Sequence, residues 1–316
     1  MRHLSFLLIL AFVTSVQAED VRIVLWNGEE LFKVSDVNDR RSDLEAFAAH
    51  FDDVDILLID EVCSLAVVER VRDLMGLDGF HVVCSDFSQN DNNQHGSFEV
   101  GVISRFPITQ AVEYDVTPDN RPHSRGGEPA ERPLAPDSIL KLGLAKAKPG
   151  RGFLWVRIDD LKLTIALAHL KSSRSSNEAE NAQKREFVAA AMALSVLEDR
   201  ENFPGYSYVV AGDLNVGFTD LKKNGEDLVV DAIGGEAGDR YDDTHAIFGK
   251  GLIGGLKMTN LTANVGETFD SNQFPGTGPI DNIYVEGEIG AFAEAEKTMQ
   301  TFGSDHFAVS TVYSVP

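Results

Sequence analysis

The stretch Val209–Asn215 reads VVAGDLN, in which an apolar run leads directly into a carboxylate and an amide. Such a run predicts a buried β-strand, and its polar end predicts a loop at the edge of a sheet. Nearer the C-terminus, Ser304–His306 reads SDH and places an acid beside an imidazole, next to another strand-like run. Two such motifs far apart in the sequence indicate one composite centre. Their groups suit attack by water on a phosphate ester, with a hard divalent cation neutralising the charge.

Polar residues also stand at the ends of other strand-like runs. They are Asn27, Glu61 and His169, each directly after a run, and Asp281, Asp305 and His306, each at the opening of one. Open α/β sheets place their ligand sites at strand ends. One acid in such a place means little, because acids often stand there to be solvated. So many junctions with carboxylate, amide or imidazole groups are hard to explain by packing, and they predict a functional site.

Strand-like and helical patterns alternate along the chain. The strand-like runs are Arg22–Trp26, Asp55–Ile59, His81–Cys84, Val100–Ser104, Phe153–Ile158, Leu163–Ala168, Tyr206–Ala211, Ile280–Val285 and Phe307–Tyr313. Several are almost continuously apolar, which is typical of strands covered on both faces. Ser42 with Glu45 forms a capping-box pattern before a first helix, and the runs Ser64–Met75 and Asn177–Leu197 predict two more. This mixture predicts an α/β or α+β fold with layered sheets in one domain, since no linker divides the chain.

The N-terminus has the pattern of a secretory signal. Arg2 and His3 precede the apolar run Leu4–Val13, and small residues follow up to Ala18. This pattern predicts a signal peptide over residues 1–18, a mature domain over residues 19–316, and a secreted or periplasmic location. A buried first helix and a membrane anchor are the alternatives, but the run is short for spanning a bilayer.

The chain has only two cysteines, Cys63 and Cys84, and each follows a strand-like run. An exported protein can form disulfides, so one bridge is open to it. Two buried thiols are an equally good interpretation of this sequence. A chain of 316 residues that is 43% hydrophobic has enough core to fold without the bridge.

The formal net charge of −22 argues against a protein that coats nucleic acid by electrostatics alone. The charge is uneven, however. A basic island spans Arg121–Arg151, where seven basic residues minus three acids give +4, inside the irregular stretch Thr117–Gly152. An acidic stretch spans Asp220–Asp243. The basic island indicates an anionic partner or an ordinary solvated loop, and the sequence leaves both interpretations open.

Taken together, these segments resemble the endonuclease/exonuclease/phosphatase superfamily, and the motif pattern is most similar to its pancreatic-type deoxyribonuclease branch. The matching segments occur in family order: Leu25–Asn27, Asp60–Glu61, Gly101–Pro107, His169–Leu170, Gly212–Asn215, Ile280–Ile283 and Ser304–His306. They cover nearly the whole chain after residue 18. The resemblance implies a four-layer sandwich of two packed mixed β-sheets flanked by helices, with the site at one edge of the sheets.

The resemblance also implies a metal site. Glu61 would hold Mg²⁺, with Asn27 close by and Asp305 as a further ligand. Mg²⁺ prefers oxygen ligands and keeps several waters, so few carboxylates are needed. Mn²⁺ and Ca²⁺ are alternatives that the sequence does not separate from Mg²⁺.

The same resemblance implies catalytic roles. Asp213 would orient or deprotonate the attacking water, and Asn215 would donate to the phosphate as charge grows on it. His306 would bind a phosphate oxygen, with Asp281 fixing its ring. A carboxylate beside an imidazole raises the pKa of that imidazole, which favours the cation that a phosphate needs.

His169 distinguishes the branches of the superfamily. The position is a tyrosine in abasic-site enzymes and a histidine in the deoxyribonuclease branch, where it pairs with a glutamate just before the strand that corresponds to Gly101–Ile103 here. Here Glu99 occupies that position, so a Glu99–His169 pair would supply a general acid to the leaving oxygen. The alternative is that Glu99 is a solvated strand end. Arg151 resembles the phosphate-contacting arginine of the same branch and closes the basic island.

These features favour a secreted, metal-dependent phosphodiesterase that acts on nucleic acid, with endonuclease action favoured. A lipid or small-molecule phosphoesterase of the same fold, such as a sphingomyelinase or an inositol-phosphate phosphatase, is the main alternative. A catalytically inactive binding protein is a weaker one, because every expected polar position is filled. The expected partner is a nucleic acid substrate without stable membrane association. The sequence leaves DNA versus RNA, endo versus exo cleavage, oligomeric state and protein partners open.

Overall fold

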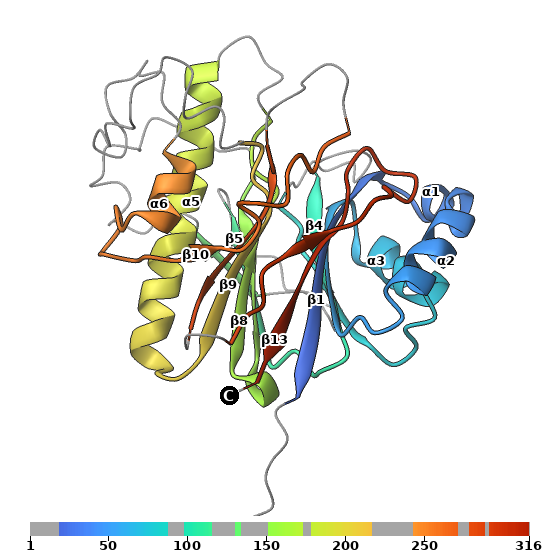
Figure 1. Cartoon of the computed structure of the whole chain (residues 1–316), viewed down its shortest axis with the longest axis horizontal. Helices are drawn as coiled ribbons and strands as arrows, with labels where there is room; N and C mark the ends of the chain where they lie inside the picture. Colours follow the sequence, from blue (N-terminus) through green and yellow to red (C-terminus); the bar gives the residue numbers. More distant parts are fainter. Residues whose placement is uncertain are drawn as a thin grey trace, which may run out of the picture.

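The computed structural model describes residues 19–87, 98–115, 130–133, 151–172, 178–216, 243–270, 278–287 and 291–315. Within these residues two β-sheets face each other in the middle of the molecule, and helices cover the outer face of each sheet (Figure 1). The predicted signal peptide, nearly all of the basic island and nearly all of the acidic stretch lie outside the described residues. Among the described residues, the structure contains no helix with the length and apolar character needed to cross a bilayer.

The first sheet has six strands in the order β12-β13-β1-β2-β4-β3. The strands are β1 (Asp20–Leu31), β2 (Ile56–Val62), β3 (His81–Cys84), β4 (Glu99–Ser104), β12 (Glu296–Lys297) and β13 (Val309–Ser314). The β1–β2 pair is parallel, with Trp26 opposite Ile59 and Asn27 opposite Asp60, and the other pairs are antiparallel. The two central strands therefore end at the same edge of the sheet.

The second sheet has seven strands in the order β10-β11-β9-β8-β7-β5-β6. The strands are β5 (Gln110–Asp115), β6 (Ala130–Pro133), β7 (Phe153–Ile158), β8 (Leu163–Leu167), β9 (Ser207–Asp213), β10 (Thr259–Asn260) and β11 (Asp281–Glu286). The β8–β9 and β5–β6 pairs are parallel, and in the antiparallel β9–β11 pair Asp213 lies opposite Asp281. A short 3₁₀ turn at Asp159–Leu161 joins β7 to β8.

Helices complete the outer layers. Helices α1 (Val34–Asp39), α2 (Arg41–His50) and α3 (Leu65–Leu74) cover the six-stranded sheet, and α5 (Glu178–Asn202) and α6 (Thr244–Gly249) cover the seven-stranded sheet (Figure 1). The predicted four-layer sandwich of two mixed sheets flanked by helices is confirmed.

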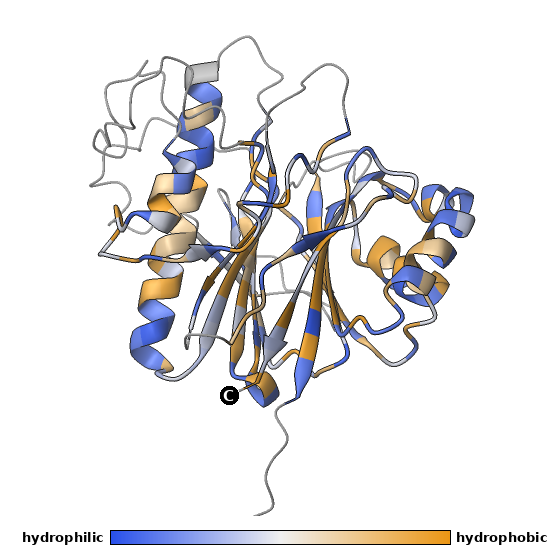
Figure 2. Ribbon diagram, in the orientation of Figure 1, coloured by the Kyte–Doolittle hydropathy of each residue, from blue (hydrophilic) through white to orange (hydrophobic). Residues whose placement is uncertain are grey.

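Three apolar cores hold the four layers together, one at each boundary between layers. The middle core joins residues such as Leu58 of β2 and Ile165 of β8, both 0% exposed, across the two sheets. The outer cores pack Phe47 of α2 and Met192 of α5 against the sheet that each helix covers. Strands buried on both faces need apolar residues at successive positions, which explains the near-continuous apolar runs in the sequence and the apolar centre seen in Figure 2.

Some local expectations were wrong. Helix α2 begins at Arg41, so Ser42 lies inside its first turn, and the N-cap residue Arg40 makes no side-chain cap hydrogen bond. Asp305 and His306 precede β13 by several residues and do not open it. Strand β5 was not predicted, because its sequence QAVEYD alternates polar and apolar residues only weakly. Cys63 and Cys84 are present as thiols, and burial raises the pKa of Cys84 well above its usual value.

One buried acid lies on β5, away from the strand ends described above. Glu113 is 0% exposed and accepts a hydrogen bond from the backbone N–H of Asp86. Burial, followed by the negative charge of Glu99, raises the pKa of Glu113 to about 9. The carboxyl is therefore protonated in the folded protein at neutral pH, whereas in the unfolded chain it ionises near its ordinary pKa of 4.5.

Glu113→Gln is expected to remove a pH dependence of stability. The folded acid holds a proton that the unfolded acid loses, so the free energy of unfolding falls as pH rises from about 4.5 to about 9, by at most about 1.4 kcal/mol per pH unit. Urea unfolding at several pH values measures this slope. The slope should flatten in Glu113→Gln and persist in Glu201→Gln, which changes an exposed acid on α5. Parallel curves for Glu113→Gln and the parent would contradict a protonated Glu113.

Candidate active site

Polar side chains from both sheets meet at one edge of the sandwich. The amide nitrogen of Asn27 on β1 lies 3.2 Å from Oε1 of Glu61 on β2, and also 3.2 Å from Oδ2 of Asp213 at the end of β9. It lies 3.4 Å from Nε2 of His306. Asn27 and Asp213 are buried, and Glu61 is partly exposed. One amide therefore links groups from three distant parts of the sequence.

His169 lies beside the same carboxylates. Its Nε2 is 3.5 Å from Oδ2 of Asp213 and 3.8 Å from Oε1 of Glu61. Strand β8 ends at Leu167, and the backbone N–H of Leu170 donates to the carbonyl of Asp213, which holds this segment against the end of β9. The structure therefore brings Asn27, Glu61, His169, Asp213 and His306 together at one edge of the sandwich.

His306 is oriented by Asp281. Its Nδ1 lies 2.8 Å from Oδ2 of Asp281, and its Nε2 faces Asp213 at 3.8 Å and Asp305 at 3.6 Å. Burial alone lowers the pKa of His306, but the carboxylates of Asp281, Asp213 and Asp305 outweigh it and raise the pKa to about 10. His306 is therefore a cation at neutral pH, with Nε2 presented to the centre.

Asp213 has an environment suited to proton transfer. Burial, then the charge of Asp281, raise the pKa of Asp213, while His306 opposes them, and the result is about 7. Its backbone N–H donates to Oδ2 of Asp60 at 2.7 Å, which connects β9 of one sheet to β2 of the other. Burial also raises the pKa of Asp60 well above its usual range. A base with a pKa near the working pH is the most effective general base.

Strained backbone is concentrated at this edge. Glu61 has φ 60° and Asn215 has φ 54°, and Glu29 and Glu30 also have positive φ. The register between β2 and β4 shifts between Asp60 and Val62, so Glu61 sits in a β-bulge. Residues other than glycine rarely adopt positive φ, and such strain is found at functional sites where the surroundings enforce it. The bulge turns Glu61 toward Asn27.

The loop after β9 positions Asn215. The backbone N–H of Asn215 donates to Oδ1 of Asp213 at 2.9 Å, and its side-chain nitrogen donates to the carbonyl of Leu170 at 3.1 Å. Gly212, with φ 136°, lets β9 pass close to the backbone of Ala168. Gly212, Asp213 and Asn215 of the GDLN motif thus each have a structural role at this edge.

A comparison with protein-family models matches residues 25–306 to the endonuclease/exonuclease/phosphatase family. The chain belongs to this family. Members of the family hydrolyse phosphoester bonds. A comparison with curated protein sequences found no significant match.

Solved structures of the endonuclease/exonuclease/phosphatase type share the fold. One from Bacteroides vulgatus has a TM-score of 0.57 at 15% identity and covers 94% of this chain and 100% of its own. Sphingomyelinase C from Streptomyces griseocarneus has a TM-score of 0.56 at 12% identity, with 94% and 100% covered. Truncated TDP2 from Caenorhabditis elegans has a TM-score of 0.52 at 16% identity, with 93% and 97% covered. At these identities the likeness concerns the fold alone.

The family generally uses divalent metals, and the groups at this edge fit one. Atoms of Glu61, His169 and Asp213 lie within 4.8 Å of one another and could hold a metal ion. Atoms of Asp213, Asp281 and His306 lie equally close together, but the protonated ring of His306 has no lone pair for a cation. Oδ1 of Asp281 is buried and has no hydrogen-bond partner among the residues that the structure describes, so it could interact with a positive group. Oxygen-rich sites of this kind suit Mg²⁺, Mn²⁺ or Ca²⁺.

The other predicted metal ligands have different surroundings. Asn27 turns its nitrogen to Glu61 and Asp213, and its Oδ1 accepts the backbone N–H of Glu29. Asp305 lies 3.6 Å from Nε2 of His306, and its negative charge adds to burial in raising the pKa of Glu29. In the described residues, neither carboxylate–histidine group that could hold a metal includes Asp305. Ligation by Asn27 and Asp305 stays a prediction.

Hydrogen bonds fix Glu99 and Arg151, and Arg151 lies near enough to Glu61, Asp213 and Glu99 to interact with their charges. Oε2 of Glu99 accepts hydrogen bonds from the hydroxyl of Ser85 at 2.6 Å and from the backbone N–H of Phe87 at 2.8 Å. Nη1 of Arg151 donates to the carbonyls of His169 and Leu170. Burial lowers the pKa of Arg151, against the opposing charges of Glu61, Asp213 and Glu99. The paired action of Glu99 and His169 stays a prediction.

Two residues that the sequence did not single out belong to this edge. The centroid of the Phe98 ring lies 4.5 Å from the guanidinium carbon of Arg151 and 5.4 Å from the centroid of the His169 ring, so Phe98 packs against both side chains. Oγ1 of Thr268 accepts the backbone N–H of Asp281, which fixes the start of β11. Phe98 could have been noticed from its place directly before Glu99, whereas Thr268 carries no sequence signal.

Proposed function

We propose that this protein is a secreted, divalent-metal-dependent phosphodiesterase that cleaves nucleic acid, with endonuclease action on DNA or RNA. The proposal rests above all on one observation, the placement of Asp213, with a pKa of about 7, between the cationic His306 and the carboxylate of Glu61. That arrangement provides a base for water, a cation for phosphate and an acidic group for a metal ion within one centre.

In the proposed mechanism, Asp213 removes a proton from the attacking water, and Nε2 of His306 donates to a non-bridging phosphate oxygen. Asp281 holds His306 in the charged form and in a fixed orientation throughout. The side chain of Asn215 lies at the same edge to donate to the phosphate as its charge increases. A divalent cation held by Glu61, with Asn27 and Asp305 as further ligands, would neutralise charge on the phosphate.

We further propose that His169, supported by Glu99, protonates the leaving oxygen, as in the deoxyribonuclease branch. The position of His169 supports this role, because its Nε2 faces Asp213 and Glu61 at the site where a phosphate would bind. Arg151, which interacts with the charges of Glu61 and Asp213, would contact the phosphate.

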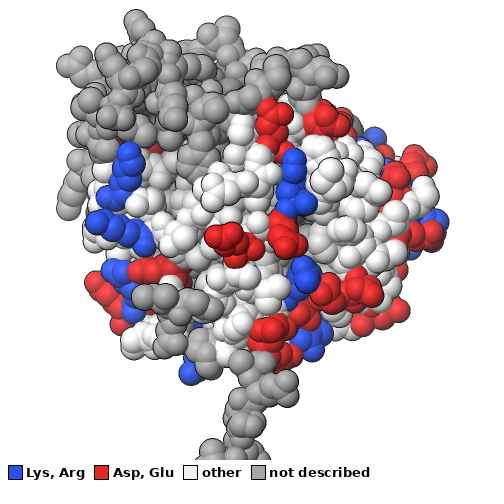
Figure 3. All heavy atoms as spheres, in the orientation of Figure 1, with Lys and Arg blue, Asp and Glu red and all other residues white. Residues whose placement is uncertain are grey.

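The negative net charge of the protein opposes its association with an anionic substrate such as nucleic acid. Acidic and basic side chains are interspersed on the described part of one face (Figure 3), and the chain carries a net charge of −22. Nucleic acid would therefore be attracted by local cations such as Arg151 and by divalent ions. A lipid or small-molecule phosphoester remains the second candidate, since the sphingomyelinase C of Streptomyces griseocarneus shares this fold. An exported protein without stable membrane association fits the nucleic acid proposal best.

A substrate panel tests the proposal. Purified protein with Mg²⁺ should nick supercoiled plasmid, and EDTA should stop the reaction. Release of phosphocholine from sphingomyelin, or of inorganic phosphate from inositol phosphates, would instead favour the second candidate. Inertness toward all three with substrate still bound would favour a binding protein. N-terminal sequencing of protein exported by a bacterial host tests whether residues 1–18 are removed.

Arg151→Gln is expected to weaken substrate affinity more than it weakens folding. Loss of one phosphate-neutralising cation should raise the substrate dissociation constant about tenfold and reduce the slope of log affinity against log salt by about 1. Binding of a catalytically blocked variant to an oligonucleotide across a salt series measures this slope. Arg105→Gln is the matched control, because Arg105 pairs with Asp55 and Glu19. Equal slopes for Arg151→Gln and the parent would exclude a phosphate contact.

A further inference from the structure

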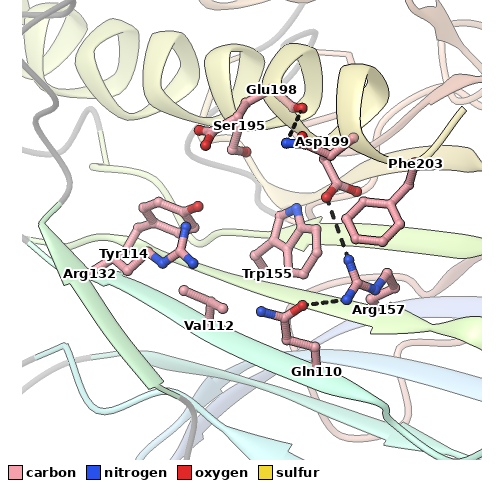
Figure 4. A pocket seen from close by; sticks show the side chains of 11 residues that line it. Gln110, Val112, Tyr114, Arg132, Trp155, Arg157, Ser195, Glu198, Asp199 and Phe203 are labelled. Atoms are coloured by element: carbon pink, nitrogen blue, oxygen red, sulfur yellow. Dashed lines mark hydrogen bonds and ion pairs between the residues drawn. The ribbon is translucent and has the colours of Figure 1, made fainter.

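Helices α5 and α6 cover the outer face of the seven-stranded sheet, and buried polar side chains lie beneath both (Figure 1). Beneath α5, Arg157 of the sheet pairs with Asp199 of the helix (Figure 4). His245 of α6 instead binds a loop of the candidate active site. It is 5% exposed, and its Nε2 lies 2.9 Å from the carbonyl oxygen of Val216, the residue after Asn215. A buried histidine of the outer layer is therefore connected directly to the active-site loop.

The two hydrogen bonds of His245 determine where its ring carries a hydrogen. The carbonyl of Val216 can only accept, so the hydrogen is on Nε2. Nδ1 lies within hydrogen-bonding distance of the hydroxyl of Tyr284 on β11. Burial raises the pKa of Tyr284, so this hydroxyl keeps its proton and donates to Nδ1. The neutral ring of His245 therefore satisfies a partner on each side.

Asn215 has a backbone conformation that its surroundings must enforce. Its φ of 54° lies in the left-handed region, which residues other than glycine rarely adopt. On its N-terminal side, its own N–H donates to Oδ1 of Asp213. On its C-terminal side, the carbonyl of Val216 accepts from His245. The hydrogen bond from His245 therefore secures the second end of this strained turn.

Apolar surroundings make the hydrogen bond from His245 hard to replace. Val216 is 1% exposed and belongs, with Ile247 and Phe248 of α6, to an outer apolar core. A buried carbonyl that loses its donor has to move toward water or bear the cost of an unmet hydrogen bond. Because Val216 follows Asn215 directly, such a movement would also shift Asn215.

We propose that His245 is a positioning residue that holds Asn215, through the carbonyl of Val216, in the conformation that presents its amide to the phosphate. His245 acts from the outer layer of the sandwich and not on the substrate itself. Its contribution to turnover rests on the proposed phosphodiesterase function, whereas its hold on the loop does not.

Two amide substitutions separate the two hydrogen bonds of His245. The side chain of His245→Gln reaches about as far as Nε2 and keeps a donor for Val216, whereas that of His245→Asn reaches only about as far as Nδ1. Hydrogen exchange at the backbone N–H of Asn215, followed by NMR, measures the hold on the loop without requiring activity. Exchange should be about tenfold faster in His245→Asn and near-parental in His245→Gln. Equal exchange in His245→Asn and the parent would overturn the proposal.

The parent itself provides a measurement that needs no variant. NMR of the ring nitrogens should show a neutral His245 with its hydrogen on Nε2. A hydrogen on Nδ1 alone would leave no donor for Val216. That result would overturn the proposal even where a variant fails to fold.

Turnover tests the consequence for catalysis. Asn215 donates as charge grows on the phosphate, so its displacement in His245→Asn should lower kcat about 10–100-fold and leave KM near the parental value. Phe248→Leu is the matched control, because it shrinks a buried side chain of the same helix and keeps the hydrogen bond to Val216. It should lose stability and keep kcat. Near-parental kcat in His245→Asn, with a parent that cleaves substrate, would overturn the positioning role.

A double variant identifies the residue through which His245 acts. Adding His245→Asn to Asn215→Ala should lower kcat no further, because the group that His245 positions is already absent. An independent further loss would place the effect elsewhere and overturn the proposal. A parent that is inert toward every substrate, yet shows the exchange difference, would refute the phosphodiesterase function and confirm the hold of His245 on the loop.

Discussion

Asp213→Asn is expected to lower the turnover number for phosphodiester cleavage about 10²–10⁴-fold while the fold is retained. The asparagine keeps the size of the side chain and an oxygen that can accept the backbone N–H of Asn215, so the loop after β9 has the means to keep its shape. It cannot take a proton from water. Steady-state rates on plasmid or oligonucleotide, with circular dichroism to check the fold, measure the effect.

The pH profile of the parent provides an independent test of the same role. Asp213 must be ionised to act as a base, so activity should rise with pH through its pKa of about 7. A bound cation pulls this value down, so the rising limb lies at or below that pH. Activity should fall again near pH 10, where His306 loses its charge. Asp55→Asn, which changes a carboxylate paired with Arg105, serves as the control. Near-parental turnover in Asp213→Asn would refute the assignment of the base.

Gly212→Ala is expected to produce the largest loss of stability, on the order of 4 kcal/mol. Gly212 has φ 136°, which L-residues rarely adopt, and a Cβ there would lie 1.8 Å from the carbonyl oxygen of Ala168. The added Cβ and the carbonyl oxygen of Ala168 are both attached directly to the backbone. Relieving the contact would therefore require the segment after β8 to move away from β9. Folded domains are stable by only about 5–15 kcal/mol, so this loss is a large fraction of the total.

The measurement is the free energy of unfolding in urea, with Gly249→Ala as the matched control. Gly249 lies at the end of α6, where a Cβ would meet no atom within 4 Å, so its replacement should change stability by no more than about 0.5 kcal/mol. Equal free energies of unfolding for the two variants would show that the backbone can relieve the contact between residue 212 and Ala168 at little cost, and would contradict the prediction.

The sequence predicts the layers of the fold, and the polar residues that it singled out meet at one edge of the sandwich in the structure. Apolar runs such as Ile56–Ile59 mark strands that are buried on both faces, and their polar ends mark the functional edge. Such signals are local, and they identified Asn27, Glu61, Asp213 and His306. The weakly patterned β5 was missed because its neighbours in the sheet, not its own residues, determine its conformation.

The contacts between distant segments and the unusual backbone conformations could not be predicted from the sequence. The pairing of Asp60 with the backbone of Asp213 joins residues 153 positions apart, and no local pattern records it. The bulge at Glu61 and the positive φ of Asn215 require residues that are not glycine to be held by their surroundings. The support that Phe98 gives to Arg151 and His169 likewise depends on how separate segments meet in space.

The hydrogen bond between Asp60 and the N–H of Asp213 connects the two sheets, and the side chains of the candidate active site come from both of them. The alignment of these side chains therefore depends on the apolar core between the two sheets, whose contacts have no preferred direction and so resist a relative shift of the sheets only weakly. We therefore expect mild heat or denaturant, by shifting one sheet relative to the other by a fraction of an ångström, to abolish the proposed activity before any strand unfolds.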